Sequence, residues 1–220
     1  MKKAVIFDLD GTLIDSELFY LNLLLEFLKG KGMVLSFEEA CKTVGAHNSP
    51  IWENVARAHG GSISGKALRQ GDKNEFERKF RNRELDYSQM QFADVLPVLE
   101  KLRADGVRMA IASSSSDKII RRVVEQQNWE RFFPVLVSGD NFRKSKPDPE
   151  IYRYTMKQLG TAPEETLVVE DSTYGIEAGK AAGVMVAARR DLRFGFHQEK
   201  ADCLFDDMRE ILLKISDKYV

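Results

Sequence analysis

Close to its start, the sequence contains Lys3-Ala4-Val5-Ile6-Phe7-Asp8-Leu9-Asp10-Gly11-Thr12, in which a short apolar run is followed at once by two carboxylates. A continuous apolar run between a charged residue and a glycine is typical of a buried parallel strand. The acids would then lie at the carboxyl end of that strand, where ligands bind in an open α/β sheet. Two carboxylates in one crevice repel each other, so the stretch predicts a cation there.

Further apolar runs lie later in the chain, and segments with helical periodicity separate them. Strands that alternate with helices in this way predict an α/β fold, with a parallel, Rossmann-like sheet sandwiched by helices. The last helix is expected at about 206–217. The additional strands are expected at 107–112, 135–137, 166–169 and 184–188.

The segment between the first two predicted strands has a different character. From Ser36 to about Tyr87 its pattern is helical, with breaks at 45–50 and 59–65 and no convincing strand. An all-helical block inserted after the first strand predicts a cap domain rather than a part of the sheet. We therefore expect a catalytic α/β core formed by residues 1–15 and 92–220, and a helical cap formed by 16–91.

The composition excludes several classes of partner. Lysine and arginine total 33 against 34 acidic residues, and no long block carries one sign of charge. Such a balance predicts neither a nucleic-acid nor a membrane surface. The apolar segment 18–28 is too short to cross a bilayer. The two cysteines, Cys41 and Cys203, are far apart in sequence, which favours a reduced, cytoplasmic protein; we expect a monomer.

Polar residues follow two more of the predicted strands, and a Lys-Pro pair precedes a predicted helix. Ser113 comes directly after the strand at 107–112, and Glu170-Asp171 follow the strand at 166–169. Lys146-Pro147 precedes a helix for which Asp148 and Pro149 are the expected N-cap and first residue. The second acidic pair repeats the design of the first, because an apolar strand again delivers adjacent carboxylates to the same edge of the sheet.

These motifs resemble those of the haloacid dehalogenase-like phosphohydrolases. The family opens with an Asp-x-Asp-x-Thr loop after the first strand, which here reads Asp8-Leu9-Asp10-Gly11-Thr12. The serine, lysine and acidic-pair signatures follow in the family's order. The resemblance covers the whole core and the position of the cap, although the cap sequence itself matches no signature.

The resemblance implies a Mg²⁺-dependent phosphatase that acts on a small phosphorylated metabolite, such as a sugar phosphate. Asp8 would be the nucleophile that forms an aspartyl-phosphate, and Asp10 the general acid and base. Ser113 and Lys146 would complete the catalytic set. Mg²⁺ would be held by Asp8, the backbone carbonyl of Asp10, Asp171, and Glu170 or its water. The expected substrate and phosphate contacts are Gly11, Thr12, Ser113, Ser114 and Lys146, with His47 and Asn48 from the cap.

Other activities remain open. A β-phosphoglucomutase shares the scaffold, but it carries a histidine and an arginine at offsets that here give Tyr20 and Asn48. A dehalogenase is disfavoured, because Asp10 has no role in displacing halide. A non-catalytic, receiver-like module that binds phosphate is a third reading, although such a module would lack the helical insert.

Overall fold

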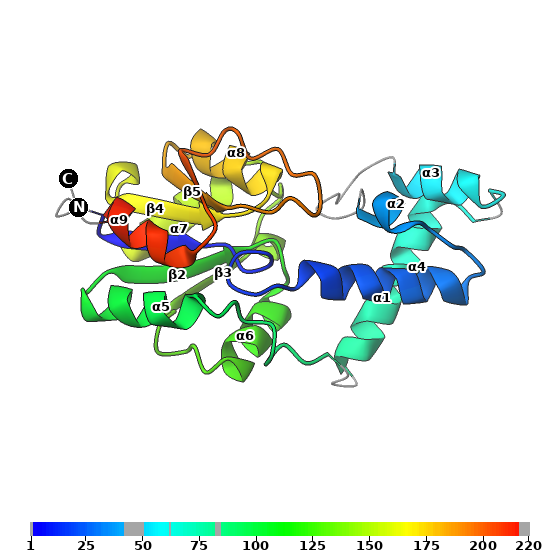
Figure 1. Ribbon diagram of the computed structural model, residues 1–220, viewed down its shortest axis with the longest axis horizontal. Helices are drawn as coiled ribbons and strands as arrows, with labels where there is room; N and C mark the ends of the chain where they lie inside the picture. Colours follow the sequence, from blue (N-terminus) through cyan, green and yellow to red (C-terminus); the bar gives the residue numbers. More distant parts are fainter. Residues whose placement is uncertain (1, 42–50, 62, 82–84, 216–220) are drawn as a thin grey trace. The chain divides into compact units, whose positions relative to one another are not determined.

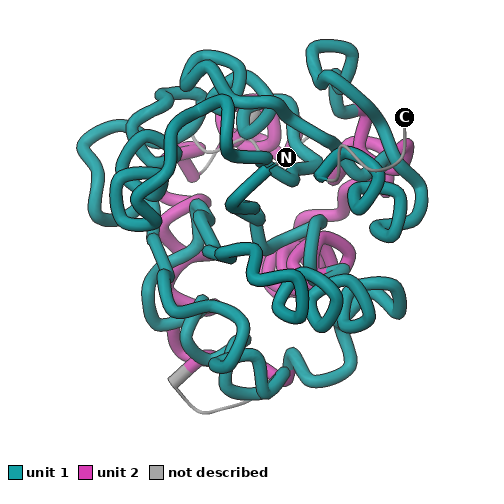
Figure 2. The backbone as a smooth tube through the Cα atoms, turned by 90° about the vertical axis from the view of Figure 1, so that its left-hand side faces the viewer, with its two compact units in different colours: residues 1–15, 87–191, 196–220 teal, residues 16–86, 192–195 magenta. Residues whose placement is uncertain are grey.

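The computed structural model describes residues 2–41, 51–61, 63–81 and 85–215 (Figure 1). The chain forms two compact units, which Figure 2 colours separately. Unit 1 contains residues 1–15, 87–191 and 196–220, and unit 2 contains residues 16–86 and 192–195. The assignment of a catalytic core and a cap, with the boundaries given above, stays a prediction.

The described residues of unit 1 form a six-stranded sheet in the order β3-β2-β1-β4-β5-β6, and every neighbouring pair is parallel. The first strand in the chain is therefore central. This architecture confirms the predicted α/β fold. The strands are β1 (Ala4–Phe7), β2 (Arg108–Ser113), β3 (Val135–Ser138), β4 (Thr166–Glu170), β5 (Met185–Arg189) and β6 (Cys203–Phe205).

Helices cover both faces of this sheet, and Figure 1 shows α8 and α5 on opposite sides of it. One face packs against two helices through a cluster of buried apolar side chains that includes Ile151, Met156 and Ile176. Burial on both faces explains why the central strands are continuously apolar. The helices of unit 1 are α5 (Val95–Ala104), α6 (Asp117–Gln126), α7 (Glu150–Leu159), α8 (Thr173–Ala181) and α9 (Ile211–Ile215).

The regular secondary structure in the described part of unit 2 is helical. Its first helix begins after Ser16, and a reciprocal capping box opens the second, in which Glu39 N donates to Ser36 Oγ and Ser36 N donates to Glu39 Oε2. None of the helices in the described ranges of either unit is long and apolar enough to cross a membrane. The helices of unit 2 are α1 (Glu17–Gly30), α2 (Phe37–Cys41), α3 (Ile51–Ala58) and α4 (Gly65–Arg81).

Three details differ from the sequence predictions. The strand β6 was not predicted. The expected helix at 206–217 is instead a 3₁₀ turn at Met208–Glu210 followed by the short α9, within the residues described. The N-cap of α7 is Pro149 rather than Asp148, although Asp148 Oδ1 still accepts a hydrogen bond from Glu150 N at 3.0 Å. The proline at this position already has helical dihedral angles, so the carboxylate caps from one residue further out.

Candidate active site

Asp8 leaves the central strand β1 between two neighbouring strands. Phe7 pairs with Ile111 of β2 on one side and with Val169 of β4 on the other. Asp8 N donates a hydrogen bond to Val169 O at 2.9 Å, so the chain is still held by the sheet at this residue. Asp8 is buried, with 7% of the residue exposed. The fold thus places this carboxylate beside the carboxyl ends of both neighbouring strands.

The loop after Asp8 comes very close to Asp171. Gly11 has a φ of +75°, and a Cβ built on it would lie 2.2 Å from Asp171 Oδ2. Only glycine suits both the dihedral angle and the space. Thr12 Oγ1 donates to Asp171 Oδ1 at 3.2 Å. The Asp-x-Asp-x-Thr loop is therefore shaped around the second acidic pair.

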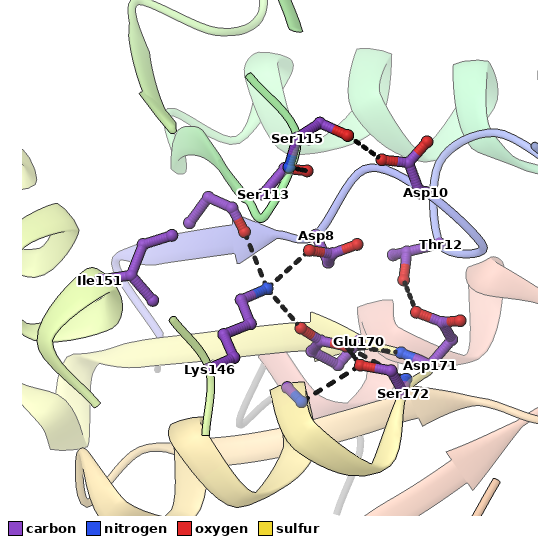
Figure 3. Close-up of polar contacts among 12 residues, drawn as sticks. Asp8, Asp10, Thr12, Ser113, Ser115, Lys146, Ile151, Glu170, Asp171 and Ser172 are labelled. Atoms are coloured by element: carbon purple, nitrogen blue, oxygen red, sulfur yellow. Dashed lines mark hydrogen bonds and ion pairs between the residues drawn. The ribbon is translucent and has the colours of Figure 1, made fainter. Parts of the chain in front are cut away.

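Lys146 joins the two acidic segments (Figure 3). Its Nζ lies 2.6 Å from Asp8 Oδ1 and 2.6 Å from Glu170 Oε1, and it also donates to Ala112 O at 3.0 Å. The lysine side chain is 5% exposed. A buried ammonium with three acceptors uses all of its donors, so its position relative to Asp8 is well defined.

Glu170 accepts hydrogen bonds at both of its carboxylate oxygens. Besides Lys146, Tyr152 OH donates to Oε1 at 2.6 Å. Asp171 N, Ser172 N and Ser172 Oγ donate to Oε2 at 3.0, 3.2 and 3.1 Å. The helix that follows needs glycine at Gly175, because a Cβ there would lie 1.8 Å from Glu170 Oε1. Glu170 is held rigidly against Lys146.

Burial and charge shift the proton equilibria of these groups. Burial raises the pKa of Asp8 to about 7, against the opposing effect of Lys146, and Glu170 and Asp10 raise it further. Burial also acts to raise the pKa of Glu170, but Lys146 and the hydrogen bonds to the carboxylate bring it below its usual value. Burial alone would lower the pKa of Lys146, yet the charges of Asp8 and Glu170 raise it well above the ordinary value. A further positive charge beside Asp8 would favour its ionised form.

Three carboxylates could hold a metal ion. One oxygen from each of Asp8, Glu170 and Asp171 lies within 4.8 Å of the others, and all three side chains are buried. Oxygen-only donor sets suit Mg²⁺ and Ca²⁺ rather than softer metals. The residues present therefore fit a hard divalent cation.

The loop after β2 holds Asp10. Ser115 Oγ donates to Asp10 Oδ2 at 2.6 Å, and Ser115 N donates to Ser113 Oγ at 3.0 Å (Figure 3). Ser138 Oγ donates to Ser115 O at 2.7 Å. The predicted phosphate residue Ser113 is buried at the end of β2, and Ser114 beside it is half-buried. In this loop, the Ser115 hydroxyl binds Asp10, and the Ser113 hydroxyl accepts the hydrogen bond from Ser115 N.

The structure gathers most of the sequence-predicted site residues at one edge of the sheet: Asp8, Asp10, Gly11, Thr12, Ser113, Ser114, Lys146, Glu170 and Asp171. His47 and Asn48 lie outside the described residues. Tyr20, which the mutase comparison singled out, packs in unit 2 against the rings of Phe19 and Phe76. Sequence reasoning missed Ser115 and Tyr152. Ser115 is one of four consecutive serines, and Tyr152 is spaced like an ordinary core residue of α7.

Comparison with known proteins gives consistent matches. A family model described as haloacid dehalogenase-like hydrolase matches residues 5–189. The chain is 29% identical over 191 residues to phosphoglycolate phosphatase from Aquifex aeolicus, which spans 84% of this chain and 83% of that protein. It is 29% identical over 196 residues to phosphorylated carbohydrates phosphatase from Thermotoga maritima, spanning 83% and 82%.

A solved structure of β-phosphoglucomutase from Clostridium difficile has the same fold. Its TM-score is 0.75, and the alignment covers 100% of this chain and 97% of that chain at 20% identity. At this identity the likeness concerns the fold alone. The family model, in contrast, runs from the second residue of β1 to the end of β5 and includes each of the acidic segments described above. The chain belongs to the haloacid dehalogenase-like hydrolase family.

Proposed function

We propose that this protein is a Mg²⁺-dependent phosphatase that hydrolyses a small phosphomonoester through an aspartyl-phosphate on Asp8. The observation that carries the proposal is the position of Lys146 Nζ, 2.6 Å from both Asp8 and Glu170, whose carboxylates cluster with that of Asp171. Among the described residues, the site at the carboxyl edge of the sheet has three carboxylates but only one cation, so it would repel a group with concentrated negative charge. A second cation is needed before such a group can bind there.

The chain's own residues supply the covalent chemistry. Asp8 attacks phosphorus, the P–O bond to the leaving group breaks, and Asp10 gives its proton to the departing alcohol oxygen. Asp10 then takes a proton from water, whose oxygen attacks phosphorus, and the acyl-phosphate bond breaks to release phosphate and free Asp8. Splitting the substitution into two steps lowers each barrier, and proton transfer by a positioned acid contributes typically about 10²–10⁴-fold.

Other side chains prepare this step. Ser115 Oγ donates to one oxygen of Asp10 at 2.6 Å, and this contact would orient the acid for proton transfer. Lys146 offsets the charge of the nucleophile and of the phosphoryl group, and Ser113 and Ser114 would donate to phosphate oxygens. Gly11 and Thr12 shape the loop that surrounds the phosphate. These roles are proposed for the residues that the sequence motifs indicate.

Asp8, Asp171 and the backbone carbonyl of Asp10 would hold the magnesium ion directly. Glu170 would act through a water molecule, because its two oxygens already accept five hydrogen bonds from the protein. When bound, the ion offsets repulsion between the carboxylates and the phosphoryl group. The fit rests on the all-oxygen donor set and the 4.8 Å limit given above.

We also propose that residues 16–91 act as a cap that selects the leaving group, with His47 and Asn48 among its substrate contacts. The relatives named above are phosphatases of phosphoglycolate and of phosphorylated carbohydrates, so small phosphorylated acids and sugars are the first candidates. The predictions of a cytoplasmic monomer without nucleic-acid or membrane partners stay predictions.

A substrate panel tests the proposal. Purified protein is assayed for phosphate release from phosphoglycolate, hexose phosphates and nucleoside monophosphates, with Mg²⁺ and with EDTA. We expect Mg²⁺-dependent release from at least one small phosphomonoester, and none from the Asp8→Asn protein. Activity of Asp8→Asn at the wild-type level would refute the assignment of the nucleophile.

A mutase is the second candidate, since the C. difficile neighbour shares the fold. A mutase must grip a second phosphate, and the uncharged Tyr20 and Asn48 offer no positive charge for it. We therefore expect hydrolysis when the enzyme receives β-glucose 1-phosphate, trace glucose 1,6-bisphosphate and Mg²⁺. Rapid formation of glucose 6-phosphate with little free phosphate would favour the mutase instead.

A further inference from the structure

Arg189 is a buried charge that the proposed reaction does not use. It is the last residue of β5 and is 6% exposed. Buried arginines are rare unless they are paired. Its guanidinium carbon lies 4.1 Å from the ring centre of Phe92 and 5.3 Å from that of Phe205, so aromatic rings fix the plane of the group.

Asp94 holds the guanidinium in place. Arg189 Nη1 and Nη2 donate to Asp94 Oδ2 and Oδ1 at 3.1 and 3.0 Å, which is the two-pronged geometry that arginine forms with a carboxylate. Asp94 Oδ2 also accepts from Met208 N at 2.6 Å. Asp94 is therefore fixed by Arg189 and by Met208 N. It binds the two Nη atoms of the guanidinium, and the third edge, which carries Nε, faces another acceptor.

That third edge reaches the loop that carries the proposed nucleophile and acid. Arg189 Nε donates to Thr12 O at 3.2 Å. The side chain of the same threonine donates to Asp171. Gln198 adds a second connection, because its Nε2 donates to Arg189 O at 2.6 Å and to Asp171 O at 2.5 Å. Arg189 thus contacts, directly or through one residue, both acidic loops of the candidate site.

We propose that Arg189, locked by Asp94, is a positioning residue that holds the Asp-x-Asp-x-Thr loop in its reactive shape. The catalytic role of Arg189 rests on the proposed function, whereas its effect on the shape of the loop does not. The hydrogen bond from Arg189 Nε to Thr12 O ties this loop to the end of β5. Without this donor, the carbonyl would lose its anchor and the loop could shift against Asp171.

The expected effect is on the rate rather than on substrate affinity. A mutation far from the chemistry that misplaces the reacting groups by about 1 Å can cost about 10²-fold in rate. The Arg189→Met protein should therefore lose about 10²-fold in kcat with a much smaller change in KM. Arg189→Lys should lie between it and the wild type, because an ammonium cannot bind the carboxylate with two prongs and reach Thr12 O at once.

Arg190 supplies a matched control. It is the next residue, it is exposed, and its Nε pairs with Asp206 Oδ1 at 3.0 Å without touching the loop. Hydrogen exchange by mass spectrometry reads the loop directly. The amides of Gly11 and Leu13 donate to Ile14 O and Leu9 O, so a loosened loop exchanges them faster.

We expect faster exchange across residues 9–15 in Arg189→Met, unchanged exchange across β4, and no change at either place in Arg190→Met. Equal exchange at 9–15 in the two variants, or an equal rise throughout unit 1, would overturn the proposal. Exchange is independent of activity, so a wild type without phosphatase activity would refute the proposed function and leave the positioning test intact. Should Arg189→Met fail to fold, Asp94→Asn and Arg189→Lys are tested by hydrogen exchange in the same two segments, residues 9–15 and β4.

Discussion

Replacing Lys146 by methionine tests the electrostatic design of the site. The methionine keeps the length of the side chain but leaves Asp8 and Glu170 as buried carboxylates without the ammonium that lies 2.6 Å from each. Breaking a buried ion pair by removing one partner costs about 3–5 kcal/mol. We expect a loss of this size in the free energy of unfolding at pH 8 without divalent cations.

The loss should depend on pH, with a sign that follows from linkage. Without Lys146, the pKa values of both carboxyls rise in the folded protein, so the folded state binds more protons than the unfolded state. Stability is then highest at acidic pH and falls as the pH rises. A smaller deficit at pH 6 than at pH 8 is therefore expected, because Asp8 becomes protonated at the lower pH.

Tryptophan fluorescence can measure the unfolding of unit 1 separately from that of unit 2. The sequence contains two tryptophans, of which Trp129 is fully buried in unit 1 and Trp52 lies in unit 2. Urea unfolding in a Trp52→Phe background therefore reports on the sheet. Lys144→Met is the control, since Lys144 belongs to the same segment but is exposed and lies 3.9 Å from Asp148.

A double-mutant cycle completes the test. Adding Asp8→Asn to Lys146→Met removes one of the two uncompensated charges, and the coupling energy between the two positions should be about 1–3 kcal/mol. A deficit for Lys146→Met no larger than that of Lys144→Met, or no recovery on adding Asp8→Asn, would refute the reasoning.

Further predictions concern the metal, the acid and unit 2. Calorimetric titration should show that Asp171→Ala weakens Mg²⁺ binding more than Ser113→Ala does, because only the first removes an anionic ligand; equal affinities would contradict this. Ser115→Ala removes the hydrogen bond to Asp10 and should lower kcat about tenfold in steady-state assays; an unchanged kcat would speak against the orientation of Asp10. In unit 2, burial raises the pKa of Asp72 from its usual 3.8 to about 6. The folded state then favours the protonated form, so stability falls as the pH rises from about 4 to 6. Asp72→Asn should therefore stabilise the protein above pH 6 by about 1–2 kcal/mol, after allowance for partial exposure, and have little effect near pH 4, as thermal unfolding at both pH values would reveal.

The strands that carry the site could be predicted because each is a continuous apolar run, which is typical of a buried parallel strand. The predicted strand at 166–169 corresponds to β4, whose residues are all buried. Cys203–Phe205 gave no such signal, since it is three residues long and mostly half-exposed. Asp202, which precedes it, accepts a hydrogen bond from Val186 N at 2.7 Å. That contact with β5 holds β6 at the sheet, and local sequence contains no trace of it.

The site shows the same limit. Asp8 and Glu170 could be found because each directly follows an apolar run. Ser115 could not be told from its neighbours, because its role depends on which of four serines faces Asp10. Arg189 resembles any charged residue at the end of a strand, and its partner Asp94 lies far away in sequence. Motifs identify residues at the ends of strands, whereas the partners that hold those residues in place come from elements far away in sequence.

Trapping the phosphorylated enzyme tests the central claim most directly. The protein is mixed with a substrate that it hydrolyses and Mg²⁺, quenched with acid within the first turnover, digested and analysed by mass spectrometry. We expect a phosphoryl group on the peptide that contains Asp8 and Asp10, located on Asp8 by fragmentation, and absent from the Asp8→Asn protein. Turnover with the phosphoryl group on a different residue, or undiminished turnover by Asp8→Asn, would contradict the account.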